Sequence, residues 1–320
     1  MKKIIVPVIL SSLFLIGCSD DAGTEKADAD QAASEQAAGT KTEAVIKDNE
    51  NVSKLWESSD SELKTPESVI HDQKRNVIYV SSMNSGPMEK EEKGFISKMS
   101  LEGEILELEW FSKPLWSPTG MAIAGDQLYV ADVNRVVQID LETATLVSTY
   151  PVSSAVFFND VAADQDGNVY VSDMMTNSIH RIKDGFMKLW VTSEKLDTPN
   201  GLTVAGENLI VGSWGVIDGE GFSTSVPGRL LSVGLCDTEI SDLGSASIGN
   251  LDGVEQMPSG NFLVTDWLNG KLLSVDQKGQ AEMLLDLEQG SADHEYISES
   301  GLVLIPMMNN NKVVAYSYKE

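Results

Sequence analysis

Residues 251–267 read LDGVEQMPSGNFLVTDW, and residues 199–214 read PNGLTVAGENLIVGSW. Each stretch has a polar residue in second place, Asp252 or Asn200, followed by a short strand, a tight turn containing glycine and an alternating apolar strand. An Asp-Gly pair ahead of a strand is ordinary turn chemistry. Whether Asp252 does more than shape a turn therefore depends on the rest of the chain.

The same two-strand unit occurs six times along the chain. The other copies start at Pro66, Pro118, Phe158 and Ala292. Successive copies lie about 40 to 50 residues apart with no helical pattern between them, which is typical of a β-propeller with one blade per unit. The second-place residues are Glu67, Thr119, Asn159, Asn200, Asp252 and Asp293.

Other segments supply the remaining strands of the blades. The predicted third and fourth strands include RVVQIDL (135–141), SIHRIKDG (178–185), RLLSVGL (229–235) and KLLSVDQKG (271–279). A propeller must close its ring, and VSKLWES (52–58) and KVVAYSY (312–318) are expected to complete the sixth blade from both ends of the chain. The alternative, a two-sheet β-sandwich, would not produce six equivalent segments in one register. We therefore expect an all-β, six-bladed β-propeller over residues 52–320.

The first 18 residues have the features of an export signal. Lys2 and Lys3 precede a short apolar run over 4–16, too short to span a bilayer as a mature helix. The run ends in Leu-Ile-Gly before Cys18, which resembles a bacterial lipoprotein box and predicts a signal peptide at 1–17 with lipid on Cys18. An ordinary secretory signal with an unrelated cysteine is the alternative.

Residues 18–51 are predicted to be a lipidated cysteine followed by a flexible acidic tether. They are rich in Ala, Asp, Glu, Gln, Thr and Ser and have few large apolar side chains, so they cannot offset the entropy of ordering. The expected location is the cell envelope. Because Ser19 rather than Asp follows the cysteine, a Gram-negative host would carry the protein on the periplasmic face of its outer membrane.

The charge of the chain limits its partners. A net charge of −26 and a pI near 4.3 argue against nucleic acid, because an acidic surface repels phosphate. Cys236 has no cysteine partner if Cys18 is lipidated, so no structural disulfide is expected. We expect a monomer that binds a small-molecule substrate or ligand and contacts the membrane through the lipid on Cys18.

Because the second-place residues share one register, we expect them to lie together at one end of the propeller axis. Equivalent positions of a propeller converge on its axis, so three carboxylates and two carboxamides would form a ring without a Lys or Arg. A bound cation is the simplest way to offset the repulsion between these carboxylates. Oxygen ligands suit Ca²⁺ best, with Mn²⁺ or Mg²⁺ as alternatives and Zn²⁺ disfavoured by the lack of a His or Cys cluster. Taken singly, each residue would be read as a turn residue.

Four motifs resemble those of the senescence marker protein (regucalcin) and gluconolactonase family, here as a bacterial lipoprotein. They are PESVIHD with Glu67, the Asn159-Asp160 pair, PNGL with Asn200, and the Asp252-Gly253 pair. The family consists of six-bladed propellers with one catalytic divalent metal on the axis. The resemblance implies that Glu67, Asn159, Asn200 and Asp252 hold the metal and that Asp252 is the catalytic carboxylate.

The sequence also departs from the family. Several lactonases carry an Arg shortly before the Asn-Asp pair, where this chain has Val156, Phe157 and Phe158, so a more apolar pocket wall is expected. The predicted substrate and pocket residues are Thr119, Phe158, Asp160 and Asp293. His294 is a candidate acid, base or orienting residue, or else a structural hydrogen-bonding residue.

Two functions remain open at this stage. The first is an envelope-anchored, divalent-metal-dependent hydrolase acting on a lactone or related ester, in which the metal stabilises the oxyanion and Asp252 activates water or attacks directly. The alternative is a non-catalytic propeller that binds a ligand or protein and uses the ion as a structural plug.

Three further features have structural interpretations. The segment Trp214–Pro227 is expected to be a surface loop that could overhang the pocket. The pairs Met174-Met175 and Met307-Met308 are expected to pack between blades. Acidic residues recur after the second strand of a unit and are expected to accept hydrogen bonds that stabilise the blades; they are Asp132, Asp173 and Asp266.

Overall fold

The computed structural model describes residues 50–58, 62–219 and 222–320. The predicted signal peptide, Cys18 and the predicted tether as far as residue 49 lie outside these ranges. Within the described ranges the chain forms six four-stranded antiparallel sheets and one two-stranded sheet. The fold is an all-β, six-bladed propeller, as the repeat predicted.

The first three blades are each built from four consecutive strands, starting at the axis and ending at the outer rim. Blade 1 consists of β2 (Pro66–Asp72), β3 (Val77–Ser82), β4 (Phe95–Met99) and β5 (Ile105–Glu107). Blade 2 consists of β6 (Pro118–Ala124), β7 (Gln127–Asp132), β8 (Arg135–Asp140) and β9 (Thr145–Pro151). Blade 3 consists of β10 (Phe158–Ala163), β11 (Val169–Asp173), β12 (Ser178–Lys183) and β13 (Phe186–Thr192).

The last three blades contain the insertion and the closure. Blade 4 consists of β14 (Pro199–Ala205), β15 (Asn208–Ser213), β18 (Leu230–Gly234) and β19 (Ile240–Asp242), with the hairpin β16 (Gly215–Ile217) and β17 (Thr224–Pro227) inserted after β15. Blade 5 consists of β20 (Leu251–Gln256), β21 (Phe262–Asp266), β22 (Lys271–Val275) and β23 (Ala281–Asp286). Blade 6 consists of β24 (Glu295–Ile297), β25 (Leu302–Met307), β26 (Lys312–Tyr318) and β1 (Val52–Glu57). Short 3₁₀ turns occur at η1 (Met174–Thr176), η2 (Glu194–Leu196) and η4 (Met308–Asn310).

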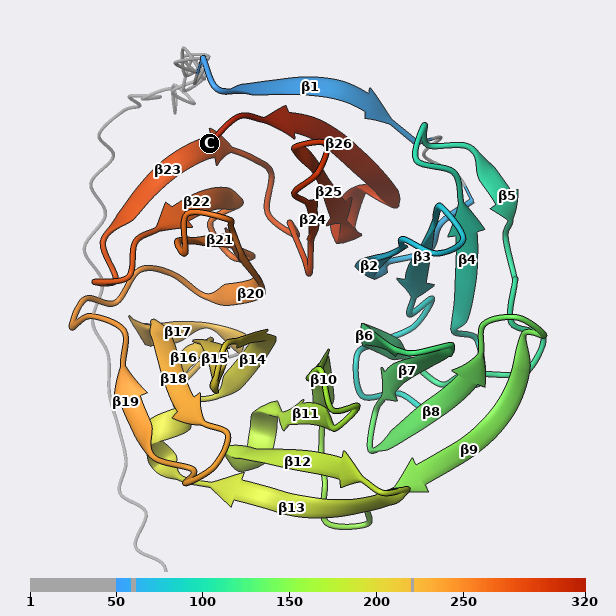
Figure 1. Cartoon of the computed structure of the whole chain (residues 1–320), viewed down its shortest axis with the longest axis horizontal. Coiled ribbons are helices and arrows are strands. Elements are labelled where there is room, and N and C mark those ends of the chain that lie inside the picture. The colour runs from blue at the N-terminus through green and yellow to red at the C-terminus, as the bar shows by residue number, and fades with distance from the viewer. Residues whose placement is uncertain (1–49, 59–61, 220–221) are drawn as a thin grey trace, which may run out of the picture. The chain divides into compact units, whose positions relative to one another are not determined.

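Figure 1 shows the sheets around a central axis, with β2, β6, β10, β14, β20 and β24 nearest to it. The predicted closure of the ring is confirmed, because β1 pairs antiparallel with β26 and so gives blade 6 its outer strand. The four segments predicted as third and fourth strands all supply third strands, β8, β12, β18 and β22. The fourth strands are separate segments further along the chain.

The register of the sixth unit differs from the one predicted. In five blades the first-place residue pairs with the last residue of the second strand, as Leu251 does with Asp266. In blade 6 the corresponding bridge joins Ser291 to Met307. Ala292 therefore occupies second place, and Asp293 is in third place. The sequence overlay was one residue out because β24 is short and begins only at Glu295.

Glycines in third place allow neighbouring blades to approach each other closely at the axis. A Cβ added at Gly201 would lie 1.7 Å from the carbonyl oxygen of Asp252 in the next blade. A Cβ at Gly120 would lie 2.2 Å from Oδ1 of Asp160, and one at Gly253 would lie 2.6 Å from the backbone nitrogen of His294. Any other residue at these places would push the innermost strands apart.

The hydrophobic core lies between the blades. One cluster combines Tyr129 and Val136 of blade 2 with Phe158 and Val171 of blade 3, and the other blade interfaces are filled in the same way. Each sheet buries alternate side chains against each neighbouring sheet, as expected for stacked sheets that have two covered faces.

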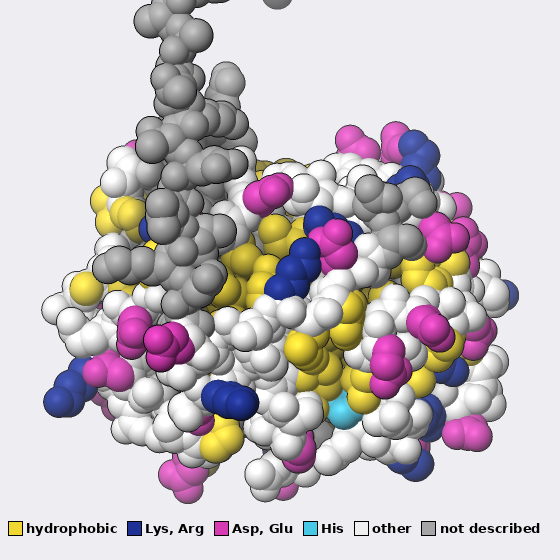
Figure 2. Space-filling view, turned by 90° about the horizontal axis from the view of Figure 1, so that it is seen from above, with side chains coloured by type: hydrophobic (Ala, Val, Ile, Leu, Met, Phe, Trp, Pro, Cys, Tyr) yellow, Lys and Arg dark blue, Asp and Glu magenta, His cyan; other side chains and the backbone are white. Residues whose placement is uncertain are grey.

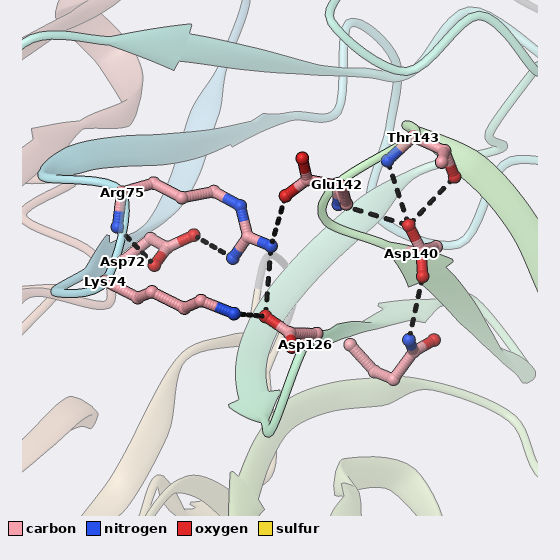
Figure 3. Close-up of polar contacts among 8 residues, drawn as sticks. Asp72, Lys74, Arg75, Asp126, Asp140, Glu142 and Thr143 are labelled. Atoms are coloured by element: carbon pink, nitrogen blue, oxygen red, sulfur yellow. Dashed lines mark hydrogen bonds and ion pairs between the residues drawn. The ribbon is translucent and has the colours of Figure 1, made fainter.

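Polar contacts join turns of blades 1 and 2 (Figure 3). Arg75, in the turn between β2 and β3, pairs with Asp72 of its own blade at 3.0 Å and with Asp126 of blade 2 at 3.0 Å. It also reaches Glu142 at 3.3 Å, and Lys74 pairs with Asp126 at 2.7 Å. This network holds the turn of one blade to its neighbour.

Acidic side chains are spread over the face of the molecule shown in Figure 2 and do not form one patch. The chain as a whole carries a net charge of −26. Cys236 is a free, exposed thiol. In the described part of the chain, no helix has both the length and the apolar character needed to cross a membrane.

Candidate active site

A cavity of about 260 Å³ opens at one end of the propeller axis. Five of the six predicted ring residues line it: Glu67, Thr119, Asn159, Asn200 and Asp252. All five are buried, and each comes from the start of the innermost strand of a different blade. The shared register thus brings side chains from five blades together.

Buried aspartates hold the strand entrances in place. Asp173, at the end of β11, accepts hydrogen bonds from the backbone N–H groups of Val156 at 3.1 Å and Phe157 at 3.0 Å, just before β10. Asp132 accepts two equivalent bonds, at 2.9 and 2.8 Å, ahead of β6. Asp266 accepts one from Asn250 at 3.2 Å ahead of β20. The prediction that these aspartates stabilise the blades is confirmed.

Three side-chain oxygens of the ring residues have no hydrogen-bond partner. They are Oε2 of Glu67, Oδ1 of Asn159 and Oδ1 of Asn200. The amide of Asn200 donates to Oδ1 of Asp252 at 3.4 Å, and the amide of Asn159 lies 3.9 Å from the sulfur of Met174. Both carboxamides therefore have their oxygens, rather than their NH₂ groups, free for a ligand. Unpaired buried acceptors are costly, so this arrangement suits a bound electropositive atom.

The two carboxylates of the ring lie in an unfavourable environment for negative charge. Burial, and then the nearby Asp252, Asp293 and Asp160, raise the pKa of Glu67 well above its usual range. Burial, and then Asp293, raise the pKa of Asp252, while the hydrogen bond from Asn200 lowers it. A cation on the axis would reverse this cost by favouring the charged forms.

A second layer of polar groups lies in third and fourth place, next to the ring. Asp160 accepts a hydrogen bond from the backbone N–H of Leu202 in the next blade at 2.6 Å. Asp293 accepts one from the hydroxyl of Ser68 at 2.5 Å, and burial raises the pKa of Asp293 to about 7. His294 is buried with neither ring nitrogen hydrogen-bonded, and burial lowers its pKa to about 3. His294 is therefore a neutral imidazole at neutral pH.

Three of the predicted pocket residues do not line the cavity. Phe158 is fully buried between blades 2 and 3, with its ring centroid 5.1 Å from that of His180. Its neighbour Phe157 lines the cavity instead. Side chains alternate along an extended segment, so Phe157 and Asn159 share a side that Phe158 does not. Asp160 and Asp293 are in third place beside the ring, and His294 also lies outside the cavity lining.

The sequence analysis anticipated part of the cavity wall, because residues 156–158 and the segment Trp214–Pro227 were both expected beside the pocket, but it missed Met174, Trp267 and Met308. Trp214, Phe222, Trp267, Met174 and Met308 line it together with Phe157. The predicted packing role holds for Met307, in the core, and for Met174, which is buried against Phe157 and Trp214; Met174 and Met308 also face the cavity. Four of these residues directly follow the second strand of a blade: Met174 follows β11, Trp214 follows β15, Trp267 follows β21 and Met308 follows β25. That position is the signal that could have identified them.

The residues at the cavity floor can hold a hard cation. In the ranges that the structure describes, no three His, Cys, Asp or Glu side chains are grouped closely enough to bind an ion by themselves. The ring instead offers two carboxylates, from Glu67 and Asp252, and two amide oxygens, from Asn159 and Asn200. A set of mixed-charge oxygens without nitrogen or sulfur suits Ca²⁺ or Mg²⁺.

Comparison with known proteins supports the fold. No protein family model matches the chain, and no curated protein matches its sequence. Among solved structures, a gluconolactonase from Xanthomonas campestris is similar, with a TM-score of 0.62 and 12% identity over 84% of this chain and 89% of the other. A virginiamycin B lyase from Staphylococcus aureus is similar with a TM-score of 0.59 and 11% identity, over 84% of this chain and 99% of the other. At these identities the likeness is one of fold.

Proposed function

We propose that this protein is a divalent-cation-dependent hydrolase of lactones or related esters, of the gluconolactonase-like type. The observation that carries the proposal is the cavity floor, where Glu67, Asn159 and Asn200 present unpartnered oxygens beside the Asp252 carboxylate. A structurally similar gluconolactonase supports the reaction class. In this reaction water adds across an ester C–O bond, with its hydroxyl going to the acyl carbon and its proton to the leaving oxygen.

The ring residues Glu67, Asn159, Asn200 and Asp252 would hold the cation, for which Ca²⁺ is the first choice and Mn²⁺, Mg²⁺ and Zn²⁺ are alternatives. When bound, such an ion polarises a carbonyl oxygen and stabilises the negative charge that develops on it.

The side chains around the ion have separate tasks. Asp252 is the carboxylate that takes a proton from water or attacks the acyl carbon, and the amide of Asn200 orients it by donating to Oδ1 at 3.4 Å. Burial raises the pKa of Asp252, and a cation held at the ring would favour its charged form, which is the form that accepts a proton. The apolar wall lowers the polarity around the floor, which strengthens the electrostatic interactions there.

The proposal is tested on the purified chain with Ca²⁺, Mn²⁺ or Mg²⁺, and with a chelator, against a panel of lactones and aryl esters. We expect turnover that requires the cation and that falls by about 100-fold or more in Asp252→Asn, since one acid–base group contributes about that much. Asp184→Asn is the matched control, because Asp184 is exposed on a distant turn. Turnover that is independent of the cation, or equal in Asp252→Asn and the parent, would contradict the hydrolase function.

A second candidate function is a non-catalytic propeller that binds a ligand and uses the cation as a structural plug. One observation favours it: among the described residues, no His, Lys or Arg lines the cavity. A hydrolase would have only Asp252 and Glu67, both in the cation-binding ring, for acid–base chemistry. Under this alternative, Ca²⁺ raises the melting temperature of both the parent and Asp184→Asn, and no ester is hydrolysed.

We also propose that lipid on Cys18 anchors the protein to the cell envelope, on the periplasmic face of the outer membrane in a Gram-negative host. The support is the sequence of residues 1–18. Mass spectrometry of the protein from its host would show an acylated Cys18 at the mature N-terminus. A mature protein that retains Met1, or an unmodified Cys18, would contradict the anchor.

A further inference from the structure

The cavity wall has a different character from the cavity floor. Above the ring, the wall is formed by aromatic rings and methionine side chains, and the rings are close to one another. The Trp214 and Trp267 ring centroids are 6.0 Å apart, those of Trp214 and Phe222 are 6.4 Å apart, and those of Phe157 and Phe222 are 6.3 Å apart. These separations are within the range of interacting aromatic pairs.

Three hydroxyl side chains line the cavity outside the cation-binding set, those of Thr65, Ser85 and Thr119, and two of them already donate to backbone carbonyl oxygens. The hydroxyl of Thr119 donates to the carbonyl oxygen of Phe158 at 3.2 Å. The hydroxyl of Ser85 lies 3.2 Å from the carbonyl oxygen of Met83, to which it donates. A ligand rich in hydroxyl groups would leave many of them without partners on this wall, and a buried hydroxyl without a partner is destabilising.

The charge of the site also restricts the ligand. The floor carries two carboxylates, and in the described part of the chain no Lys or Arg lines the cavity. A sugar acid or another anion would find no cationic side chain to pair with and would depend on the bound cation alone. A neutral apolar group is the best match to this wall. The cavity volume of about 260 Å³ is just below the usual lower end of about 300 Å³ for small-molecule pockets, so the ligand is small.

The hairpin β16–β17 contributes to the wall. The indole N–H of Trp214 donates to the carbonyl oxygen of Phe222 at 2.8 Å, which ties the two aromatic residues together. The buried amide of Asn250 donates to the carbonyl oxygen of Trp214 at 2.7 Å and to the hydroxyl of Thr224 at 2.8 Å. The hairpin is thus fixed to blade 5, and its aromatic side chains are held at the cavity.

We infer that the substrate is a small ester or lactone with an apolar, aromatic-sized substituent that packs against Trp214, Trp267 and Phe222. The hairpin β16–β17 is then the element that determines specificity, with Phe222 as its contact residue. The identity of the substrate rests on the proposed hydrolase function, but the apolar binding surface itself does not depend on catalysis.

The kinetic test compares δ-valerolactone, a phenyl-substituted δ-valerolactone and gluconolactone with the Ca²⁺-loaded chain. We expect kcat/KM for the phenyl compound to exceed that of δ-valerolactone by about tenfold to a hundredfold, the gain from burying a ring of that size. Phe222→Ala should reduce this preference by about fivefold or more. The matched control is Val216→Ala, because Val216 is on the same hairpin with 47% of its surface exposed.

A binding test separates this inference from the hydrolase proposal. The probe is a phenyl-substituted δ-lactam, which resists hydrolysis, and its binding is followed by the fluorescence of Trp214 and Trp267. If the lactam binds, and Phe222→Ala but not Val216→Ala weakens binding, the apolar site stands even where no lactone is turned over. If gluconolactone and the phenyl compound are hydrolysed with equal kcat/KM, or if the lactam does not bind, the inference is wrong. This holds whether or not the protein is a hydrolase.

Discussion

The substitution Glu295→Gln tests the electrostatic cost of the acidic groups near the axis. Glu295 starts β24, is partly buried and accepts a hydrogen bond from the backbone N–H of His71 at 2.9 Å. Burial raises its pKa from 4.5 to about 7, with smaller contributions from Asp293 and Glu299. In the unfolded chain the carboxyl ionises near its ordinary value. Between about pH 4.5 and 7 the folded state therefore holds more protons than the unfolded state, and stability falls as the pH rises.

The size of the effect follows from the same interval. At about 1.4 kcal/mol per pH unit, the rise of the pKa from 4.5 to about 7 corresponds to about 3 kcal/mol of stability. The folded protein keeps this stability well below pH 4.5 and has lost all of it above about pH 7. Glutamine keeps an acceptor for His71 but cannot ionise. We therefore expect Glu295→Gln to be more stable than the parent by up to about 3 kcal/mol at about pH 8.5, and equally stable at about pH 4.

The assay is urea denaturation at both pH values in the presence of a chelator, so that bound cations do not mask the effect. Asp184→Asn is the control, because Asp184 is exposed on a distant turn, and this change should leave stability unaltered at both pH values. A stability difference for Glu295→Gln that is the same at both pH values, or that is negative at the higher one, would refute the reasoning.

Two other substitutions test how the blades place the site. Gly201→Ala should prevent folding or lower the free energy of unfolding by more than about 3 kcal/mol, because its Cβ would lie 1.7 Å from the carbonyl oxygen of Asp252. Gly86→Ala, whose Cβ would meet only a flexible side chain, should have little effect in the same denaturation assay; similar losses in both would contradict this view. Asp173→Ala removes the acceptor for the backbone N–H of Phe157 and should cost about 1–3 kcal/mol in thermal or urea unfolding, whereas an unchanged midpoint would show that the strand entrance does not need it.

Much of the candidate site could be predicted because the repeat carries spatial information. Residues at the same place in each unit must converge on the axis, so Glu67, Asn159, Asn200 and Asp252 could be grouped from their register alone. The same argument placed Asp293 in the wrong layer, since the short strand β24 gave no clear register to overlay. Phe158 was chosen in place of Phe157 because the orientation of a side chain just before a strand depends on where pairing starts.

The repeat marks part of the cavity wall, because residues directly after the second strand line the cavity in several blades, but it does not mark Phe222. Phe222 belongs to the connection of a hairpin found only in blade 4, and the two methionine pairs were interpreted as packing residues. Whether Phe222 faces the cavity depends on the fold of the hairpin and on the Asn250 hydrogen bonds that hold it.

The sequence by itself determined the propeller, the number of its blades and its closure, because strand periodicity and repeat spacing are local properties that every unit repeats. Only the tertiary structure decided which oxygens are left without partners and which rings enclose the space above them. Those properties arise from contacts between residues far apart in the chain, such as Gly201 with Asp252 and Trp214 with Trp267. Burial and hydrogen-bond satisfaction are set by such contacts, and no single segment of sequence contains them.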